Sequence, residues 1–245
     1  MSRMTVQCTW DEVPHLTEEV KKQLIEGMEP HLRDARTKGI PMMGAGQIYP
    51  VPEAVWTCDP FELPEYWPRA YGMDVGWNRT AAVWGAWDRQ TDTVYIWSEH
   101  YMGQSPPAVH ASAINARGVW IRGAIDPAAA GSSQKDGSKL IEEYRELGLS
   151  LYEADNAVEA GIHAVYQRIS RGGLKVFKTC RNLISELRIY RRDEKGKVVK
   201  ENDHACDALR YLILTGMRYA TTQPRNPEDD EDAHTSHTRS SVTGY

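Results

Sequence analysis

The sequence predicts an α/β fold, a mixed β-sheet with helices on both faces. Three observations predict it. First, residues 71–76 and 80–101 have strand-like patterns. Second, helical and strand patterns alternate after them. Third, the last predicted element is a helix at 203–219. A hairpin followed by helical crossovers combines antiparallel with parallel pairing, and its helices cover both faces of the sheet.

Composition places the chain among soluble globular proteins. Its 245 residues are 41% apolar and 26% charged, enough for one full core and an appendage. No apolar run approaches the 18 residues of a membrane span, and the first residues lead into no signal-peptide core. The four cysteines form no C-x-x-C pair, which argues against a zinc site or a disulfide scaffold and fits a reducing cytoplasm.

Residues 1–60 are expected to be a lead-in that leans on another part of the protein. A helix begins after Thr17 and stops at Gly27 and Pro30. Closely spaced prolines and glycines then predict loops and a linker. Too few apolar residues are present here to bury a separate core.

The first strand, 71–76, alternates apolar residues with Gly72, Asp74 and Gly76, so Asp74 is expected opposite the apolar side chains. Turn residues 88–92 separate the strand 80–87 from the strand 93–101. The next elements are a helix opened by Pro106 and Pro107, and a strand, 119–125, that ends at Asp126.

The second half alternates regularly. The expected elements are a small-residue loop at 128–137, helices at 138–147, 156–171, 183–190 and 203–219, strands at 150–154 and 174–179, and a hairpin tip at 195–197. Asn156 and Glu159 have the spacing of a capping box. The acidic tail, 221–245, has little to bury and is expected to be disordered when alone.

The densest group of candidate metal ligands is Asp203, His204 and Asp207, at the start of the last helix. At about 100° per residue these side chains can address one point. An N-cap followed by a solvated acidic stripe would look the same. The apolar residues Leu209 and Leu212 lie nearly opposite Asp207, so either the helix packs through its edge or the ligand is Asp203.

Three distant segments would bring carboxylates to one edge of the sheet: Asp74 within a strand, Asp126 after a strand, and the last helix. Each has a plain alternative, because Asp126 before proline can simply end a strand and Asp74 can form a turn. As a set they point to cation binding, because a bare aspartate in an apolar strand is costly unless ions or donors satisfy it.

Charge is distributed unevenly. The net charge is −5, but the tail 221–245 alone carries −3, while residues 168–200 hold eleven basic and three acidic residues, a net charge of +8. This basic segment is either a solvated face or a surface that binds a phosphate backbone beside bound cations.

Short motifs then give a family resemblance. The strings MDVGW (73–77), AIDP (124–127) and DHACDALRY (203–211) resemble the nuclease domain of tailed-phage large terminase subunits, which have the ribonuclease H-like fold. The resemblance covers about residues 61–220. Residues 10–16, 36–41 and 44–49 resemble the end of the ATPase region and the linker of the same family, but the G-x-x-x-x-G-K-[ST] loop is absent, so we infer a C-terminal fragment.

The resemblance implies a divalent-metal-dependent endonuclease that cuts concatemeric viral DNA during packaging. Asp74 and Asp126 match the first two ligands of two Mg²⁺ or Mn²⁺ ions, and the last helix supplies the third, where His204 and Asp207 match the family's pair and Asp203 competes. Residues expected to hold the DNA backbone are Arg79, Lys135, Arg191, Arg192, Lys195 and Lys197.

The resemblance also implies partners and leaves alternatives. Double-stranded DNA, the small terminase subunit and the capsid portal, the last through the acidic tail, would be partners in a host cytoplasm, and no membrane is expected. One alternative is a docking module for DNA or portal with solvated carboxylates. The other is an actin-like or sugar-kinase-like ATP-binding fold, which also begins with an Asp-x-Gly turn such as Asp74 and Gly76.

Overall fold

The computed structural model describes residues 9–10, 16–26, 37, 46–130, 139–193 and 195–224. Four sequence-based predictions therefore lie outside the described residues, wholly or mostly: Lys135, the loop 128–137 beyond residue 130, the ATPase-like strings before residue 46, and the tail beyond residue 224.

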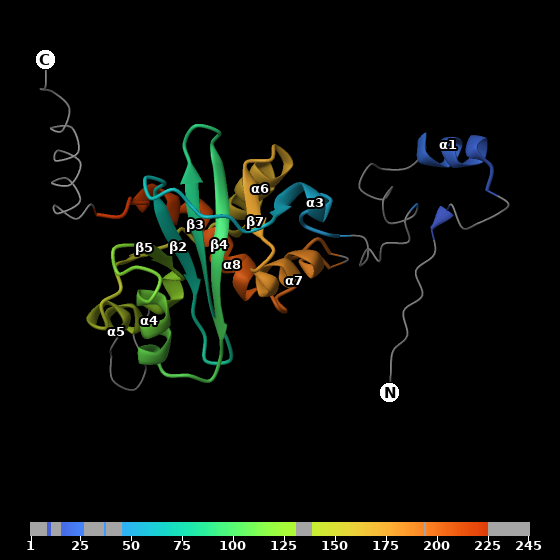
Figure 1. The fold of residues 1–245 in the computed structure, drawn as a ribbon. Coiled ribbons are helices and arrows are strands. Elements are labelled where there is room, and N and C mark those ends of the chain that lie inside the picture. The colour runs from blue at the N-terminus through green and yellow to red at the C-terminus, as the bar shows by residue number, and fades with distance from the viewer. Residues whose placement is uncertain are drawn as a thin grey trace, which may run out of the picture.

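One seven-stranded sheet forms the centre of the fold, with the strand order β1-β7-β4-β3-β2-β5-β6 (Figure 1). The strands are β1 (Thr57–Cys58), β2 (Arg69–Asp74), β3 (Thr80–Asp88), β4 (Thr93–Met102), β5 (Arg122–Ile125), β6 (Leu151–Glu153) and β7 (Leu174–Phe177). The pairs β2–β3 and β3–β4 are antiparallel, and all the other neighbours are parallel. The predicted mixed sheet is confirmed.

Helices cover both faces of this sheet, also as predicted (Figure 1). The helices are α1 (Glu18–Glu26), α3 (Glu53–Trp56), α4 (Pro107–Asn115), α5 (Leu140–Glu146), α6 (Val158–Ser170), α7 (Arg181–Ile189) and α8 (His204–Leu214). Because side chains alternate along a strand, Met73 and Trp84 face α4 and α5, whereas Ala70 and Val83 face α6, α7 and α8.

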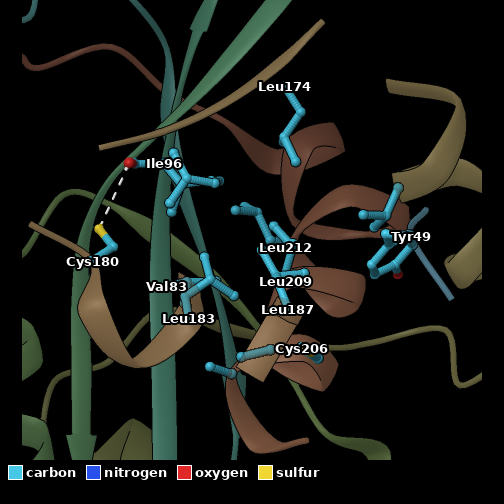
Figure 2. Close-up of a cluster of buried hydrophobic side chains, with 14 of the residues drawn as sticks. Tyr49, Val83, Ile96, Leu174, Cys180, Leu183, Leu187, Cys206, Leu209 and Leu212 are labelled. Atoms are coloured by element: carbon cyan, nitrogen blue, oxygen red, sulfur yellow. Dashed lines mark hydrogen bonds between the residues drawn. The ribbon is translucent and has the colours of Figure 1, made fainter. Parts of the chain in front are cut away.

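The larger core lies between the sheet and the three helices α6, α7 and α8. Figure 2 shows Leu209 and Leu212 of α8 directed toward Val83 and Ile96 of the sheet, with Leu183 and Leu187 of α7 beside them. Leu209 and Leu212 are fully buried, and each such side chain contributes about 1.5–3 kcal/mol to folding. This packing fixes α8 against the strand that ends at Asp74.

Gly72 permits the close approach of α8 to β2. A Cβ at this position would lie 2.0 Å from the carbonyl oxygen of Ala208 and 2.6 Å from the backbone nitrogen of Leu212. Any side chain at position 72 would therefore lift the helix away from the strand.

Helix α8 is buried on nearly all sides, which removes the predicted conflict between its apolar face and Asp207. Asp207 and Arg210 are both buried although they lie away from the leucines, because α6 and the segment before α8 cover that side. The helix ends at Leu214, and a 3-10 turn, Gly216–Tyr219, occupies the end of the predicted helix 203–219.

Several local predictions can be compared with the structure. The helix after Thr17 is confirmed as α1, with the Thr17 hydroxyl accepting from the Val20 amide at 3.4 Å. The capping box at Asn156 and Glu159 is wrong: α6 has Ala157 at its N-cap and no side-chain cap, because Glu159 pairs with Arg192 instead.

Other differences concern short elements. The strand expected at 119–125 begins only at Arg122, and α3 with β1 was not predicted, since both are very short and lie among prolines. Ile48, Tyr49 and Trp56, from the stretch that precedes the main sheet, are buried in its larger core. Among the described residues, no helix is long and apolar enough to cross a membrane.

Candidate active site

Asp74 and Asp126 lie side by side at the carboxyl ends of neighbouring parallel strands. Met73 of β2 pairs with Ile125 of β5, and the Asp126 amide donates to the Met73 carbonyl at 2.9 Å. Neighbouring strands are about 4.8 Å apart. Because Met73 and Ile125 face α4 and α5, the following residue in β2, Asp74, is directed to the opposite face, where α8 lies.

His204, the first residue of α8, contacts Asp74. Its Nδ1 lies 2.8 Å from Asp74 Oδ2, and the Asp74 side chain is only 13% exposed. The hydrogen bond to Asp74 raises the pKa of His204. Helix α8 and strand β2 therefore meet through this pair, 130 residues apart in the sequence.

Asp207 lies one turn further along α8 between two cations. Lys200 Nζ is 2.8 Å from its Oδ2, and Arg210 Nη2 is 3.1 Å from its Oδ1. Burial lowers the pKa of Lys200, but the carboxylates of Asp207 and Asp203 outweigh it, so the pKa is raised. Arg210 is 1% exposed, so its charge depends on Asp207 for neutralisation.

Asp203 occupies the N-cap position of α8 but does not cap the helix with its side chain. Its Oδ2 is buried without a hydrogen bond, and Lys200 Nζ lies 3.2 Å away. This carboxylate is thus held at the site without the amide partners that an N-cap aspartate usually takes.

The electrostatics show that these carboxylates share one region. Burial raises the pKa of Asp74; the hydrogen bond with His204 opposes this, and the negative charges of Asp207 and Asp126 add to it. Tyr211 of α8 also lies within the field of Asp126, Asp207 and Asp74, in addition to being buried, and its pKa is raised. Like charges gathered in a partly buried site favour a bound cation.

The described residues contain no three His, Cys, Asp or Glu side chains already close enough together to hold a metal ion. In this arrangement Asp74 is directed to His204, Asp207 is held by Lys200 and Arg210, and Asp126 Oδ1 accepts from the Ala128 amide at 3.0 Å. Metal binding would require side-chain rotations that release Lys200.

The expected DNA contacts lie in two places. The Arg79 guanidinium follows the turn after Asp74 and lies 4.6 Å from the ring centre of Tyr101. Arg191, Lys195 and Lys197 are exposed around the tight turn before α8. Arg192 and Val198 form an isolated antiparallel β-bridge across this turn. Arg192 itself forms a bidentate pair with Glu159, at 2.9 and 2.6 Å.

Sequence reasoning missed the partners of the site residues: Lys200, Arg210 and Glu186. In the sequence Lys200 is one of the eleven basic residues of the segment 168–200, and nothing distinguishes it from the others. Arg210 follows Asp207 by three residues, which is a usable helical signal. Glu186 follows Leu183 by three residues and precedes Leu187, so an acid on the apolar face of α7 was visible in the sequence.

Comparison with known proteins gives a consistent result. The family model described as the terminase RNaseH-like domain matches residues 71–215. The large terminase subunit of Enterobacteria phage LP7 is 34% identical over 233 residues, which cover 89% of this chain and 47% of that protein. The chain thus spans less than half the length of this curated relative.

Solved structures agree on the fold. The nuclease domain of the P22 large terminase superposes with a TM-score of 0.67 at 31% identity, covering 73% of this chain and 96% of that domain. The large terminase nuclease of the thermophilic phage G20c, solved with bound magnesium, superposes with a TM-score of 0.52 at 15% identity, covering 71% and 99%. The second likeness concerns the fold alone.

Proposed function

Because this chain belongs to the terminase RNaseH-like domain family, we propose that it is the metal-dependent endonuclease domain of a viral DNA-packaging terminase. Its substrate would be concatemeric double-stranded DNA, cut by phosphodiester hydrolysis with two divalent ions. The observation that carries this proposal is the meeting of Asp74, Asp126 and the start of α8 at one end of the sheet.

The residues present fit Mg²⁺ or Mn²⁺. Both ions prefer hard oxygen ligands, and three separate elements supply carboxylates here. The Asp203 oxygen that makes no hydrogen bond lies 3.2 Å from the Lys200 ammonium, whose place a divalent cation could take, and the burial that raises the pKa of Asp74 is a feature that a cation would relieve. Asp74, Asp126, Asp207 and Asp203 would hold the ions, with His204 as a further ligand or as a partner of Asp74.

When bound, the two ions would lower the pKa of the attacking water and stabilise the leaving oxygen. The chain's own residues orient the carboxylates and neutralise their charge. Arg210 and the leucines of α8 hold Asp207 in place, and His204 holds Asp74. The exposed Arg191, Lys195 and Lys197, with Arg79 near Asp74, would contact the DNA backbone without reading bases.

The wider role is part of the same proposal. In a packaging motor the chain would act with the small terminase subunit and the capsid portal in the host cytoplasm. The P22 structure supports the nuclease assignment most directly, because it is described as a nuclease domain and is 31% identical over most of this chain.

The test is Mn²⁺-dependent nicking of a supercoiled plasmid. Changing Asp74 or Asp126 to Ala should abolish cleavage while leaving the circular dichroism spectrum unchanged, and EDTA should abolish cleavage by the unaltered protein. Asp59→Ala is the control, since this exposed aspartate pairs with Lys178 away from the site. Undiminished cleavage by Asp74→Ala would refute the metal assignment, and DNA binding without cleavage at any ion concentration would favour the docking module.

A further inference from the structure

The N-terminus of α8 needs a cap that its own sequence does not provide. The first amides of a helix have no partner inside the helix, and an N-cap aspartate usually accepts from the second or third of them. Asp203 stands at the N-cap but makes no such hydrogen bond. Some other group must therefore satisfy the amides of Ala205 and Cys206.

Glu186 of α7 supplies this cap from a different helix. Its Oε2 accepts from the Ala205 amide at 2.6 Å and from the Cys206 amide at 3.1 Å. These are the second and third residues of α8, the positions that an N-cap side chain would serve. Glu186 is only 3% exposed. Its buried carboxylate therefore needs the two amides as hydrogen-bond donors, and the two amides need the carboxylate as their acceptor.

Tyr101 of β4 holds the other oxygen of this carboxylate. The Tyr101 hydroxyl donates to Glu186 Oε1 at 2.6 Å. Arg79 lies over the Tyr101 ring, with its guanidinium carbon 4.6 Å from the ring centre. Tyr101 thus lies between Arg79, in the turn that follows Asp74, and Glu186, which caps the helix that carries His204 and Asp207.

We infer that Glu186, held by Tyr101, is a positioning residue for the candidate metal site. By capping α8 from α7 it fixes the direction of the first turn, on which His204 and Asp207 lie. It also leaves the Asp203 carboxylate without a capping role, so that this carboxylate can pair with Lys200 at the site. This inference rests on the proposed function, because it concerns how the same site is kept ready for divalent ions.

A purely structural cap would have a different consequence. Loss of such a cap would lower stability and the folded fraction, and the affinity of the remaining folded molecules for metal would stay the same. A positioning cap sets the geometry of the ligands. Groups that hydrogen-bond metal ligands directly typically change metal affinity by about 10–100-fold when removed, and the loss of a cap that orients the ligands should act in the same direction.

The chain offers a matched control. Glu99 of β4 caps α7 in the same manner, accepting from the Asn182 amide at 3.0 Å and from the Leu183 amide at 2.9 Å. Helix α7 carries none of the proposed metal ligands, and its capped first turn precedes Glu186, which is held separately by Tyr101 and by the amides of α8. Glu99→Ala should therefore reproduce the loss of stability without the change in metal affinity.

The experiment measures Mn²⁺ binding by isothermal titration calorimetry, with no DNA present, for the unaltered protein and for the variants E186Q, E186A, Y101F and E99A. We expect E186A to weaken binding by about tenfold or more. E186Q should recover much of this loss, because its amide oxygen can still accept from Ala205 and Cys206. Y101F should weaken binding less than E186A, because it removes only the hydroxyl.

Two further measurements locate the effect. Amide hydrogen exchange at Ala205 and Cys206 should be faster in E186A than in E99A. In plasmid nicking, E186A should raise the Mn²⁺ concentration for half-maximal rate more than it lowers the maximal rate, and E186Q should lie closer to the unaltered protein. If E186A fails to fold, E186Q and Y101F carry the same comparison.

The outcomes separate the two proposals. If the unaltered protein binds no Mn²⁺ and cleaves no DNA, the proposed function fails. If it binds Mn²⁺ and E186Q, Y101F and E186A bind it equally well, or if E99A weakens binding as much as E186A, the positioning role of Glu186 is overturned while the nuclease proposal stands.

Discussion

The Lys200 ammonium lies 2.8 Å from Asp207 Oδ2 and 3.2 Å from Asp203 Oδ2. It therefore neutralises two carboxylates that we propose as metal ligands. A divalent ion that binds these oxygens has to displace this lysine, so lysine and metal compete for the same negative charge.

Lys200→Met should consequently tighten Mn²⁺ binding by several-fold. The neutral side chain keeps the length of the lysine stem but no longer competes for Asp207 and Asp203. Without metal, the same variant should be less stable by about 1 kcal/mol, since the carboxylates lose a half-exposed partner. Calorimetric titration with Mn²⁺ and urea unfolding in EDTA measure the two effects.

Lys178→Met is the control for this prediction. Its side chain is 57% exposed, against 54% for Lys200, and it lies 2.7 Å from Asp59. Removing it eliminates an ion pair with an exposed aspartate that is not a proposed ligand, and should leave Mn²⁺ affinity unchanged. Equal affinities for Lys200→Met and the unaltered protein would show that Lys200 does not compete with the metal.

Neutralising two site aspartates should change metal-free stability in opposite directions. Burial raises the pKa of Asp74. A raised pKa in the folded state means that ionised Asp74 costs stability as the pH rises above the unfolded value, so Asp74→Asn should stabilise the protein at pH 8 in EDTA. Urea unfolding, followed by circular dichroism, measures the shift.

Asp207→Asn should do the reverse. The guanidinium of Arg210 is almost fully buried and Asp207 is its carboxylate partner, so removing that charge should cost about 3–5 kcal/mol. Both variants should nevertheless lose nicking activity. A destabilised Asp74→Asn protein would mean that its hydrogen bond with His204 outweighs the cost of burial.

The neighbourhood of Asp74 and Asp126 could be predicted from the sequence, because both follow apolar strand patterns and strand ends of one direction meet at one edge of a sheet. The start of α8 could be added from its acidic spacing. These inferences use local pattern and one general rule of topology, and the structure brings the three segments together as expected.

Among the charge partners only Arg210 has a local signal, its spacing of three residues from Asp207, whereas Lys200 and Glu186 could not be predicted in the same way. Periodicity assumes that a helix has one solvated face, but α8 is covered on the Asp207 side too, by α6 and by the segment before α8, which carries Lys200. Likewise, nothing local to Asp203 indicates that Glu186 takes its capping role. Such contacts depend on how α7 and α8 approach each other, which is a property of the whole core.

Gly72→Ala should destabilise the protein by about 3 kcal/mol or more, because the new Cβ would meet backbone atoms of α8 that cannot move aside. The expected result is a lower melting temperature and, at a temperature where the variant is folded, weaker nicking, since β2 and α8 carry Asp74 and His204.

Gly85→Ala provides the comparison. There the Cβ would lie 3.0 Å from the side-chain ends of Leu212 and Val94, which can shift, so a smaller loss is expected. Equal losses would contradict the importance of the backbone contact at Gly72.

The buried pair His100 and His110 should make the fold sensitive to mild acid. His100 Nε2 lies 2.8 Å from His110 Nδ1, so one ring must donate and the other accept, and the pair cannot hold two charges at low cost. Burial, His110 and Arg117 together lower the pKa of His100 to about 4. Because this folded-state pKa is below the unfolded value, stability is full above about pH 6.5 and is lost as the pH falls toward 4.

Urea unfolding at several pH values should show a loss of about 2 kcal/mol over this range that is smaller in His100→Gln. The exposed His163→Gln should behave like the unaltered protein, and a His100→Gln curve parallel to that of the unaltered protein would assign the acid sensitivity to other groups.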